Sequence, residues 1–261
     1  MSVFSANLNF LFNEVPFMER FSEAAKAGFK NVEFMFPYDF DQDEIKRQLK
    51  ANSLNLVLFN LPAGNWSEGD RGIAADPARK EEFRAGVLKA MEAAKHLEVK
   101  RVNCLTGKVA GSYPTEEIME NLFDNISYTA DEFQKAGLDL LIEPINHFDI
   151  PGFYLNTTDQ VIEIIQKLNK PNIYLQYDIY HAEREGEDHD KVISEYISKI
   201  AHIQVADNPG RNQPGTGVVP VKDLFEKLWA KGYKGYIGFE YKPADSTVES
   251  LSWVKEYGFQ L

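Results

Sequence analysis

Short apolar runs alternate with longer amphipathic runs from one end of the chain to the other. The short runs are rich in β-branched and aromatic residues and are bounded by Gly, Pro, Asn or Asp, which is typical of strands. The runs predicted as strands span residues 3–8, 31–36, 54–61, 101–107, 139–144, 173–178, 201–207 and 236–241.

The segments between these runs have the start and stop signals of helices. In the segment 16–28, Pro16 suits a first helical turn, Gly28 suits the position after a helix, and Phe17 and Phe21 recur at helical spacing. The same signals predict further helices over residues 114–137, 220–232 and 246–258.

The order of these elements indicates the fold class. Eight strand–helix units in 261 residues are the count of an α/β chain forming a (β/α)8 TIM barrel. A doubly wound open sheet is the rival, but no GxGxxG motif follows the first predicted strand. No linker or break in composition divides the chain, so we expect a single barrel domain over residues 1–261.

Four polar side chains with oxygen atoms occur at the ends of the last four predicted strands. They are Glu143, Asp178, Gln204 and Glu240. Because the carboxyl ends of parallel barrel strands form the active-site face, we expect these side chains to converge. Carboxylates held together repel one another unless a cation lies among them. An all-oxygen set suits Mg²⁺ or Mn²⁺ better than zinc, so these four residues are the predicted metal ligands.

Glu143 and Glu240 are also the candidate catalytic residues. A lone Glu at a strand end is more often solvated or salt-bridged than functional, but four neighbouring strand ends favour a site. One carboxylate could take a proton from a substrate carbon while the other returns a proton to the next carbon. A bound metal would polarise the carbonyl. The predicted reaction class is aldose–ketose isomerisation or epimerisation.

Several cationic or imidazole side chains follow the predicted strands and are candidates for substrate binding. His181 and Arg211 are the stronger candidates, since a guanidinium in a Gly/Pro-rich loop can bind a substrate carboxylate. Lys108 and Lys242 are weaker ones, and His147 could contribute or only pack. The loops over residues 62–76 and 106–115 are long and Gly-rich, as a lid would be.

Composition limits the remaining classes of function. The net charge of −12 and the lack of a basic stripe argue against nucleic-acid binding. A lone cysteine, Cys104, lies in an apolar strand and is predicted to be a core residue, while His96 and His189 are predicted to lie on the surface. With no signal peptide and no apolar run of membrane length, we expect a cytoplasmic protein that is not bound to a membrane. The aromatic-rich stretches "NFLF" and "FMFPYDF" leave a homo-oligomer open.

The chain resembles the hydroxypyruvate isomerase family of xylose isomerase-like barrels in blocks spread over its whole length. These blocks include "VEFMFPYDF", "NCLTGK", "LLIEPINHFDIPGF", "QYDIYH", "ADNPGR", "PGTG" and "EYKP". The resemblance implies interconversion of hydroxypyruvate and 2-hydroxy-3-oxopropanoate (tartronate semialdehyde), a role in glyoxylate metabolism and no organic cofactor. It implies that Glu143 and Glu240 exchange protons with the substrate. It also implies that Asp178 and Gln204 bind the metal together with them.

Val218 departs from the family pattern, which usually has a glutamate directly after the "PGTG" glycines. That change could weaken substrate binding or shift substrate choice. Other activities stay open: a 2-oxo-tetronate isomerase, a ketose C3-epimerase, whose relatives generally have His in place of Gln204, and a non-catalytic sugar-acid binding protein. A zinc-dependent AP-site endonuclease fits poorly, because the chain is acidic and has only five histidines.

Overall fold

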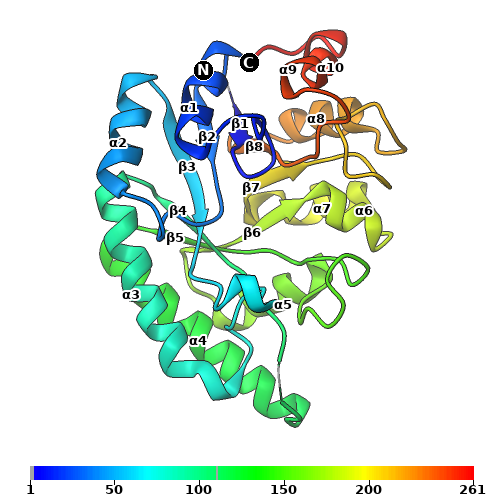
Figure 1. Cartoon of the computed structure of the whole chain (residues 1–261). Helices are drawn as coiled ribbons and strands as arrows, with labels where there is room; N and C mark the ends of the chain where they lie inside the picture. The colour runs from blue at the N-terminus through cyan, green and yellow to red at the C-terminus, as the bar shows by residue number, and fades with distance from the viewer. Residues whose placement is uncertain (1–2, 110) are drawn as a thin grey trace.

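The structure is a computed structural model that describes residues 3–109 and 111–261. Within these residues, eight parallel strands close into a barrel, with β1 paired to both β2 and β8 (Figure 1). The predicted TIM barrel is therefore confirmed. The strands are β1 (Phe4–Asn7), β2 (Asn31–Glu33), β3 (Asn55–Asn60), β4 (Arg101–Cys104), β5 (Asp139–Ile142), β6 (Ile173–Asp178), β7 (Ile200–Val205) and β8 (Tyr236–Phe239).

Most of the predicted strands extend too far at their carboxyl ends. β5 and β8 stop one residue before Glu143 and Glu240, and β2 stops at Glu33 rather than at residue 36. The apolar pattern continues past these points because most of the residues remain buried. The regular strand pairing ends there, and only individual backbone hydrogen bonds follow, such as that from Glu240 N–H to Val205 O at 3.2 Å. The acids therefore lie where the chain leaves the sheet and enters the loops.

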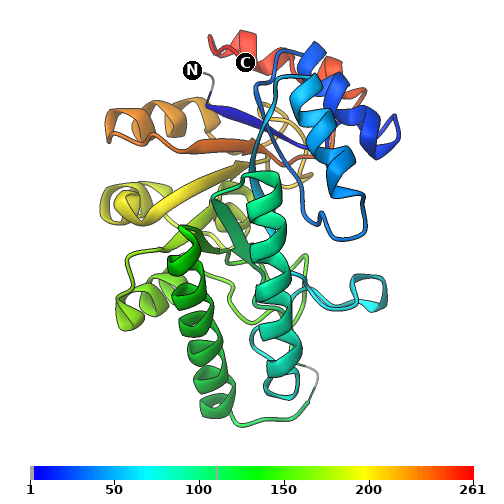
Figure 2. The ribbon, with the colours of Figure 1, turned by 90° about the vertical axis from the view of Figure 1, so that its left-hand side faces the viewer.

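Helices surround the barrel on its outer face (Figures 1 and 2). The α-helices are α1 (Phe17–Lys26), α2 (Gln42–Ala51), α3 (Lys80–Leu97), α4 (Thr115–Ala136), α5 (Thr158–Leu168), α6 (Ile179–Arg184), α7 (His189–Tyr196), α8 (Val221–Ala230), α9 (Thr247–Ser250) and α10 (Ser252–Glu256). The 3-10 helices are η1 (Trp66–Glu68), η2 (Pro77–Arg79) and η3 (Ile197–Lys199). None of the described helices is long and apolar enough to span a membrane.

The last predicted helix, 246–258, is wrong as a single element. Ser246 and Glu249 form a capping box that starts α9, but the backbone of Leu251, at ψ −4°, interrupts the helix. The second piece, α10, turns Trp253 into the core, where its ring centroid lies 4.9 Å from that of Phe239. Burial of this large ring accounts for the break.

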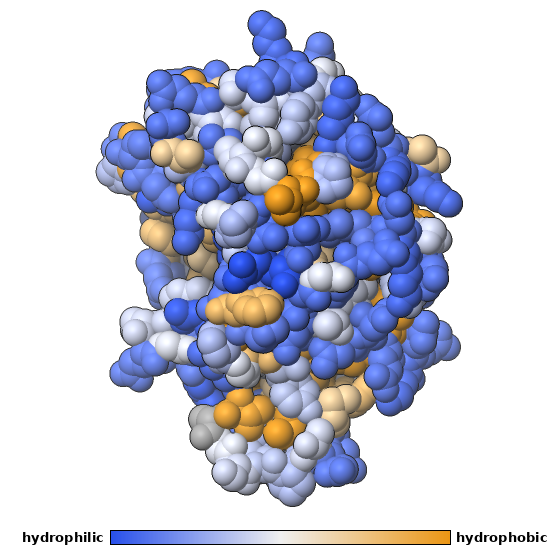
Figure 3. All heavy atoms as spheres, turned by 90° about the vertical axis from the view of Figure 1, so that its right-hand side faces the viewer, coloured by the Kyte–Doolittle hydropathy of each residue, from blue (hydrophilic) through white to orange (hydrophobic). Residues whose placement is uncertain are grey.

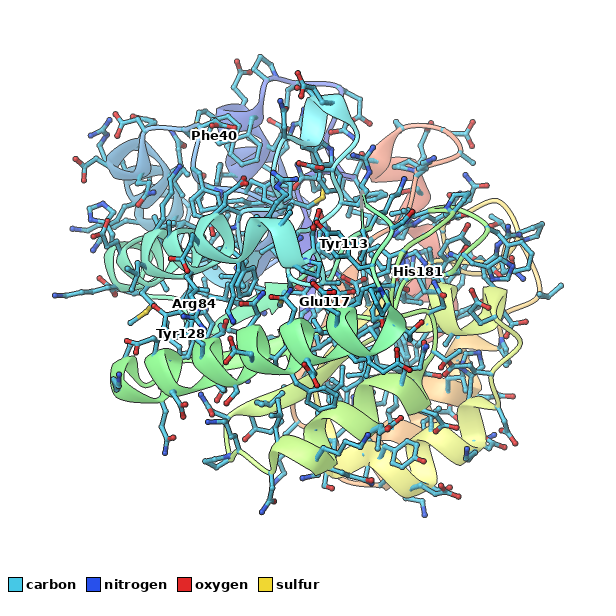
Figure 4. All side chains as sticks on the ribbon, turned by 90° about the horizontal axis from the view of Figure 1, so that it is seen from below. Phe40, Arg84, Tyr113, Glu117, Tyr128 and His181 are labelled. Atoms are coloured by element: carbon cyan, nitrogen blue, oxygen red, sulfur yellow. The ribbon has the colours of Figure 1, made fainter. Side chains whose placement is uncertain are left out.

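The two long helices, α3 and α4, pack side by side (Figure 2). Arg84 of α3 lies over the ring of Tyr128 of α4 at 4.7 Å and also pairs with Asp124 at 2.7 Å (Figure 4). Exposed large apolar side chains are scattered among hydrophilic ones, and the face in Figure 3 shows hydrophobic patches on a mostly hydrophilic surface.

Two further predictions concern buried residues. Cys104 is fully buried in β4, and burial raises the pKa of its thiol to about 12, so it is a core residue as predicted. The surface position predicted for His189 is wrong, because this residue is 8% exposed. Asp188 caps α7 and turns His189 inward, so that Nδ1 meets the Tyr177 hydroxyl at 2.5 Å and Nε2 lies 2.9 Å from Glu183.

The interior of the barrel is polar near its carboxyl end. Aliphatic side chains such as Val57, Leu58 and Leu141 form a separate small core cluster. Above them the inward-facing positions carry side chains that bond across the barrel: Ser5, Asn7, Glu33, Asn103, Gln176, His202 and Gln204. Burying so many polar side chains costs free energy unless they are hydrogen-bonded. The presence of this layer in the barrel therefore indicates a functional site rather than a packing core.

Candidate active site

A cavity of about 140 Å³ lies at the carboxyl ends of the strands. It is small beside the roughly 300–1,000 Å³ of sites for drug-sized ligands. One part of its wall is polar and includes Glu143, Gln204 and Glu240, together with His181 and Arg211. The rest is mainly apolar and comes from Phe10, Phe34, Leu58, Trp66, Leu105, Ile145 and Ile150.

Glu143 directly follows β5 and is held through one of its two carboxylate oxygens. Oε2 accepts hydrogen bonds from Asn103 Nδ2 at 2.8 Å and Gln176 Nε2 at 3.0 Å. No described residue donates to Oε1. Burial, and then the charge of Asp178, raise the pKa of Glu143 to about 8, so the carboxyl is poised to give or take a proton near neutral pH.

Asp178 is the last residue of β6 and the N-cap of α6. Its Oδ1 accepts from the backbone N–H of Tyr180 at 2.8 Å, which fixes the carboxylate. Its Oδ2 is buried and accepts no hydrogen bond from the described residues. Arg211 Nη2 is 3.6 Å from Oδ2, and burial raises the pKa of Asp178 to about 6. A buried carboxylate oxygen without a donor is an available ligand atom.

Glu240 follows β8 and has partners at both oxygens. Oε1 accepts from Arg211 Nη2 at 2.6 Å, while Oε2 accepts from Asn7 Nδ2 at 2.7 Å and Gln204 Nε2 at 2.5 Å. Burial raises the pKa of Glu240 well above its ordinary value, and the charges of Glu143 and Asp178 add to this effect, whereas Arg211 opposes it. The positive charge of Arg211 thus acts on three carboxyl groups, those of Glu143, Asp178 and Glu240.

Gln204, in β7, is fixed in orientation by a residue that the sequence analysis did not single out, Glu33 at the end of β2. Gln204 Nε2 donates to Glu33 Oε1 at 2.8 Å, and Gln204 Oε1 accepts from Gln176 at 2.7 Å. Burial alone would raise the pKa of Glu33, but His202, whose Nε2 lies 2.8 Å from Glu33 Oε2, and the hydrogen bonds of Gln204 and Ser5 lower it. Glu33 is therefore a permanent acceptor beneath the site.

His181, in α6, has a defined tautomer. Asn146 Oδ1 accepts from the backbone N–H of Asp149 at 2.8 Å, so the Asn146 amide nitrogen faces His181 Nδ1 at 2.6 Å and donates to it. Burial lowers the pKa of His181 well below its ordinary value, which leaves the ring neutral with its proton on Nε2. In this tautomer Nε2 can donate a hydrogen bond. It lies 3.5 Å from Asp178 Oδ2 and 3.5 Å from Arg211 Nη2, and the ligand atoms of His181, Glu143 and Asp178 lie within 4.8 Å of one another.

Arg211 is held from two sides. Its guanidinium carbon lies 4.9 Å from the ring centroids of both Phe10 and Tyr180. The loop that carries it is organised by Asp207, which accepts from the backbone N–H groups of residues 208, 215, 217 and 219 at 2.8–3.0 Å. Arg211 itself adopts a positive φ of 55°. The buried carboxylate of Asp207 thus fixes the backbone of a loop that contains no helix or strand.

The structure places some candidate residues outside the cavity. Lys108 and Lys242 are exposed and do not line it, and His147 is exposed and bonded to Glu185. Val218 is 65% exposed and also does not line the cavity. The substrate-binding roles of the two lysines, like the roles of the residues around the cavity, remain predictions.

Sequence reasoning missed several residues that line the cavity, among them Asn7, Glu33, Trp66, Arg71 and Gln176. A usable signal existed for Glu33 and Gln176. Glu33 interrupts the apolar run "VEF" as Glu143 interrupts "IEP", and Gln176 precedes Asp178 by two residues and so faces the same side of β6. For Trp66 and Arg71, in an irregular loop, no periodic signal exists.

The donor set fits a divalent metal ion. Glu143, Asp178 and Glu240 bring three buried carboxyls together, their pKa values are raised, and two carboxylate oxygens (Glu143 Oε1 and Asp178 Oδ2) are free of hydrogen bonds among the described residues. A cation placed among them would relieve this repulsion. Gln204 supplies a further oxygen in a known orientation.

Comparisons with known proteins agree with this fold. The family model described as xylose isomerase-like TIM barrel matches residues 21–257. A hydroxypyruvate isomerase from Escherichia coli (strain K12) is 46% identical over 254 residues, covering 97% of this chain and 98% of that protein. A 2-oxo-tetronate isomerase from Haemophilus influenzae is 35% identical over 257 residues, covering 98% of this chain and 100% of that protein.

Among solved structures, a Brucella melitensis protein titled as an AP endonuclease of family 2 superposes with a TM-score of 0.95. It is 38% identical and covers 98% of this chain and 99% of its own. An L-ribulose 3-epimerase superposes with a TM-score of 0.76 at 22% identity, covering all of this chain and 88% of its own, which shows the shared fold alone.

Proposed function

The chain belongs to the xylose isomerase-like TIM barrel family, and from this membership we propose that it interconverts hydroxypyruvate and 2-hydroxy-3-oxopropanoate. The relatives matched over nearly the whole chain are isomerases, and this chain is an enzyme of that kind. The observation that carries the specific proposal is the placement of Glu143 and Glu240 on one cavity of about 140 Å³, a size suited to a substrate of three or four carbons.

The proposed reaction is a proton transfer between neighbouring carbons. One glutamate removes a proton from C3 of hydroxypyruvate, and the C–H electron pair forms a C2–C3 double bond while the C2 oxygen takes the negative charge. The second glutamate delivers a proton to C2. Loss of the proton from the C3 hydroxyl leaves an aldehyde at C3, and the C2 oxygen gains a proton. In the metal-free protein, burial raises the pKa of both glutamates, which favours the uptake of a proton.

The charge that develops on the substrate oxygens has two kinds of partner. His181 supplies a neutral N–H, since its tautomer is fixed by Asn146. Glu143, Asp178, Gln204 and Glu240 would hold a divalent cation, for which we propose Mg²⁺ or Mn²⁺, and this ion, when bound, supplies electrostatic stabilisation of two adjacent oxygens. Phe10, Trp66 and Ile150 cover the same cavity with apolar surface, which limits the access of water.

Proton NMR of hydroxypyruvate in D₂O tests this function. We expect conversion to 2-hydroxy-3-oxopropanoate with deuterium at C2, in a reaction that EDTA suppresses and Mg²⁺ or Mn²⁺ restores. Glu143→Gln and Glu240→Gln should each lower turnover by about 10³-fold or more, because each removes one partner of the proton transfer. Glu98→Gln, at an exposed glutamate on the amino-terminal side of β4, serves as the matched control. Absence of both product and deuterium uptake with wild-type protein and metal would refute the proposal.

A 2-oxo-tetronate isomerase is the second candidate, and relatives with that name are 34–36% identical to this chain. The block "IEPINHFDIPGF", which resembles the hydroxypyruvate isomerase family, favours the three-carbon acid, and its Ile145 and Ile150 line the cavity. A comparison of kcat/KM for the three-carbon and four-carbon acids decides between the two. An endonuclease is disfavoured by the net charge of −12, which would repel a phosphate backbone.

A further inference from the structure

The proposed substrate raises an electrostatic problem at this cavity. Hydroxypyruvate and its product both carry a carboxylate, yet the cavity already contains the side chains of Glu33, Glu143 and Glu240. A further carboxylate binds most favourably against a cation whose charge is not already shared with protein carboxylates. Two arginines, Arg71 and Arg211, line the cavity, and neither described lysine near the strand ends does.

Arg211 is already engaged with protein carboxylates. Its Nη2 donates to Glu240 at 2.6 Å and lies 3.6 Å from Asp178 Oδ2, and its Nη1 lies 4.0 Å from Asp149. Its Nε has no hydrogen-bond partner among the described residues, but a substrate carboxylate at this guanidinium would compete for its charge with Glu240, one of the two proposed proton-transfer residues. Arg211 is thus better suited to hold Glu240 in place.

Arg71 has the opposite environment. Its guanidinium carbon lies 4.2 Å from the ring centroid of Trp66, and its Nη1 donates to the backbone oxygens of Trp66 at 3.1 Å and Asp70 at 2.6 Å. No carboxylate among the described residues pairs with it, and no described residue accepts a hydrogen bond from its Nε or Nη2. The side chain therefore offers a full positive charge and two uncommitted donor atoms at the cavity wall.

The backbone on either side of Arg71 is anchored, so its position is defined. Asp70 accepts from Arg79 Nη1 at 2.6 Å and from the backbone N–H of Asn65 at 2.6 Å. Gly72 bridges to Thr106 with φ +110°, and a Cβ there would lie 2.0 Å from the backbone oxygen of Leu105. Arg71 therefore projects from a preorganised loop, which lowers the entropic cost of binding a ligand.

We infer that Arg71 binds the substrate carboxylate through its guanidinium, so that the carbons that react are presented to Glu143 and Glu240. This inference rests on the proposed function, because it assigns the acid end of the proposed substrate. It transfers to Arg71 the role that the sequence suggested for Arg211. A guanidinium held over an aromatic ring with donor atoms left free is a well-matched partner for a carboxylate.

Hydroxyacetone provides the test, since it is hydroxypyruvate with a methyl group in place of the carboxylate and keeps the same reacting C–H. Deuterium exchange at the hydroxymethyl carbon is followed by NMR for both compounds, with Mg²⁺ present. Arg71→Gln should lower the rate for hydroxypyruvate on the order of 10²-fold, the value of a lost charged hydrogen bond, and leave that for hydroxyacetone within about twofold. Arg79→Gln, which loosens the same loop from outside the cavity, should affect both compounds equally.

Equal losses for both compounds in Arg71→Gln, or no loss in either, would overturn the inference. Binding of D-glycerate, measured by calorimetry, separates this result from a failure of the proposed function, because glycerate carries the carboxylate but undergoes no isomerisation. If wild-type protein does not convert hydroxypyruvate, a Kd for glycerate that rises on the order of 10²-fold in Arg71→Gln still supports the carboxylate site. An unchanged Kd refutes it.

Discussion

Glu33 Oε1 accepts a hydrogen bond of 2.8 Å from Gln204 Nε2, across the interior of the barrel. Because Glu33 is ionised, only the amide nitrogen of Gln204 can face it, and the amide oxygen is left on the other side, toward Gln176 and Glu143. Glu33 thus determines which atom of Gln204 is available to a cation.

Glu33→Gln should remove this control over Gln204. A glutamine at position 33 can donate as well as accept, so both orientations of Gln204 become accessible, and the pair with His202 loses its negative charge. We expect metal affinity and kcat to fall by about 10- to 100-fold, with a loss of unfolding free energy of about 1–3 kcal/mol. Metal titration and denaturant unfolding measure the two effects separately.

Ser5→Ala is the matched control, because Ser5 donates to Glu33 Oε2 at 2.6 Å but leaves the charge of Glu33 in place. It should cost some stability and little metal affinity. If both variants lose stability while neither loses metal affinity, Glu33 has a purely structural role.

Gly238→Ala should fail for a steric reason that involves the same carboxylate. A Cβ on Gly238 would lie 2.4 Å from both oxygens of Glu33, so the side chain would have to move away from Gln204 and His202. We expect an overpacking cost of about 1–3 kcal/mol together with reduced activity. Thermal unfolding and turnover are the measurements.

Gly86→Ala is the control for this glycine substitution. Its Cβ would meet Pro62 at 3.4 Å, and alanine favours the helix, so α3 should tolerate or gain from the change. Equal behaviour of the two variants would show that Gly238 is not needed for the Glu33 position.

The sequence was sufficient for the barrel and for the acids at the strand ends, because both follow from periodic patterns. Glu143, Asp178, Gln204 and Glu240 converge since parallel strands end on one face. Loop residues were less accessible to this reasoning. Arg71 and Trp66 reach the cavity through a chain path set by the bridge between Gly72 and Thr106, and no local pattern encodes that contact.

Misassigned residues show the same limit. His189 stands in an acidic run that is typical of a surface, yet its helix N-cap turns it onto Tyr177. The polarity of the neighbouring residues in the sequence therefore gave a wrong prediction for His189, because a single capping residue determined the direction of its side chain. The break at Leu251 likewise depends on burial of Trp253, which only the packed core defines.

The metal-free protein should lose stability as the pH rises from about 5 to 8. The folded pKa values of Glu143, about 8, and Asp178, about 6, lie above those of the unfolded chain, about 4. Such groups contribute stability fully at low pH and lose it as the pH rises through the folded pKa. Glu240 shifts in the same direction. Calorimetry in EDTA should show Tm falling across this range by an amount equivalent to a few kcal/mol.

Mn²⁺ should remove this pH dependence, since binding needs ionised carboxylates and releases protons. Its apparent affinity should therefore rise with pH up to about 8, the pKa of Glu143 in the metal-free state. Asp178→Asn removes the neighbouring charge and should flatten the Tm profile in EDTA. A Tm that is constant or rises between pH 5 and 8 in EDTA would contradict the proposed cluster of repelling carboxyls.

Asp207→Asn should displace Arg211 without replacing any residue that lines the cavity. The two oxygens of Asp207 accept four backbone N–H groups of the loop over residues 208–219, whereas the amide nitrogen of an asparagine would face two of these donors with another donor. The loop then loses about 1–3 kcal/mol of local stability, and Glu240 loses a rigid partner at 2.6 Å. We expect kcat to fall by about 10- to 100-fold with a smaller change in KM, since Arg211 holds Glu240 rather than the substrate.

Hydrogen exchange identifies the cause of that fall. The amides of residues 215, 217 and 219 should exchange faster in Asp207→Asn, while those of the barrel strands keep their wild-type rates. Thr216→Ala, in the same loop, removes only a hydroxyl that donates to Gln213 O at 2.7 Å and should leave kcat within about twofold. If Asp207→Asn speeds exchange in the loop but kcat stays at the wild-type value, then Arg211 does not depend on this loop for its hold on Glu240, and the stacking of Phe10 and Tyr180 alone is sufficient to position it.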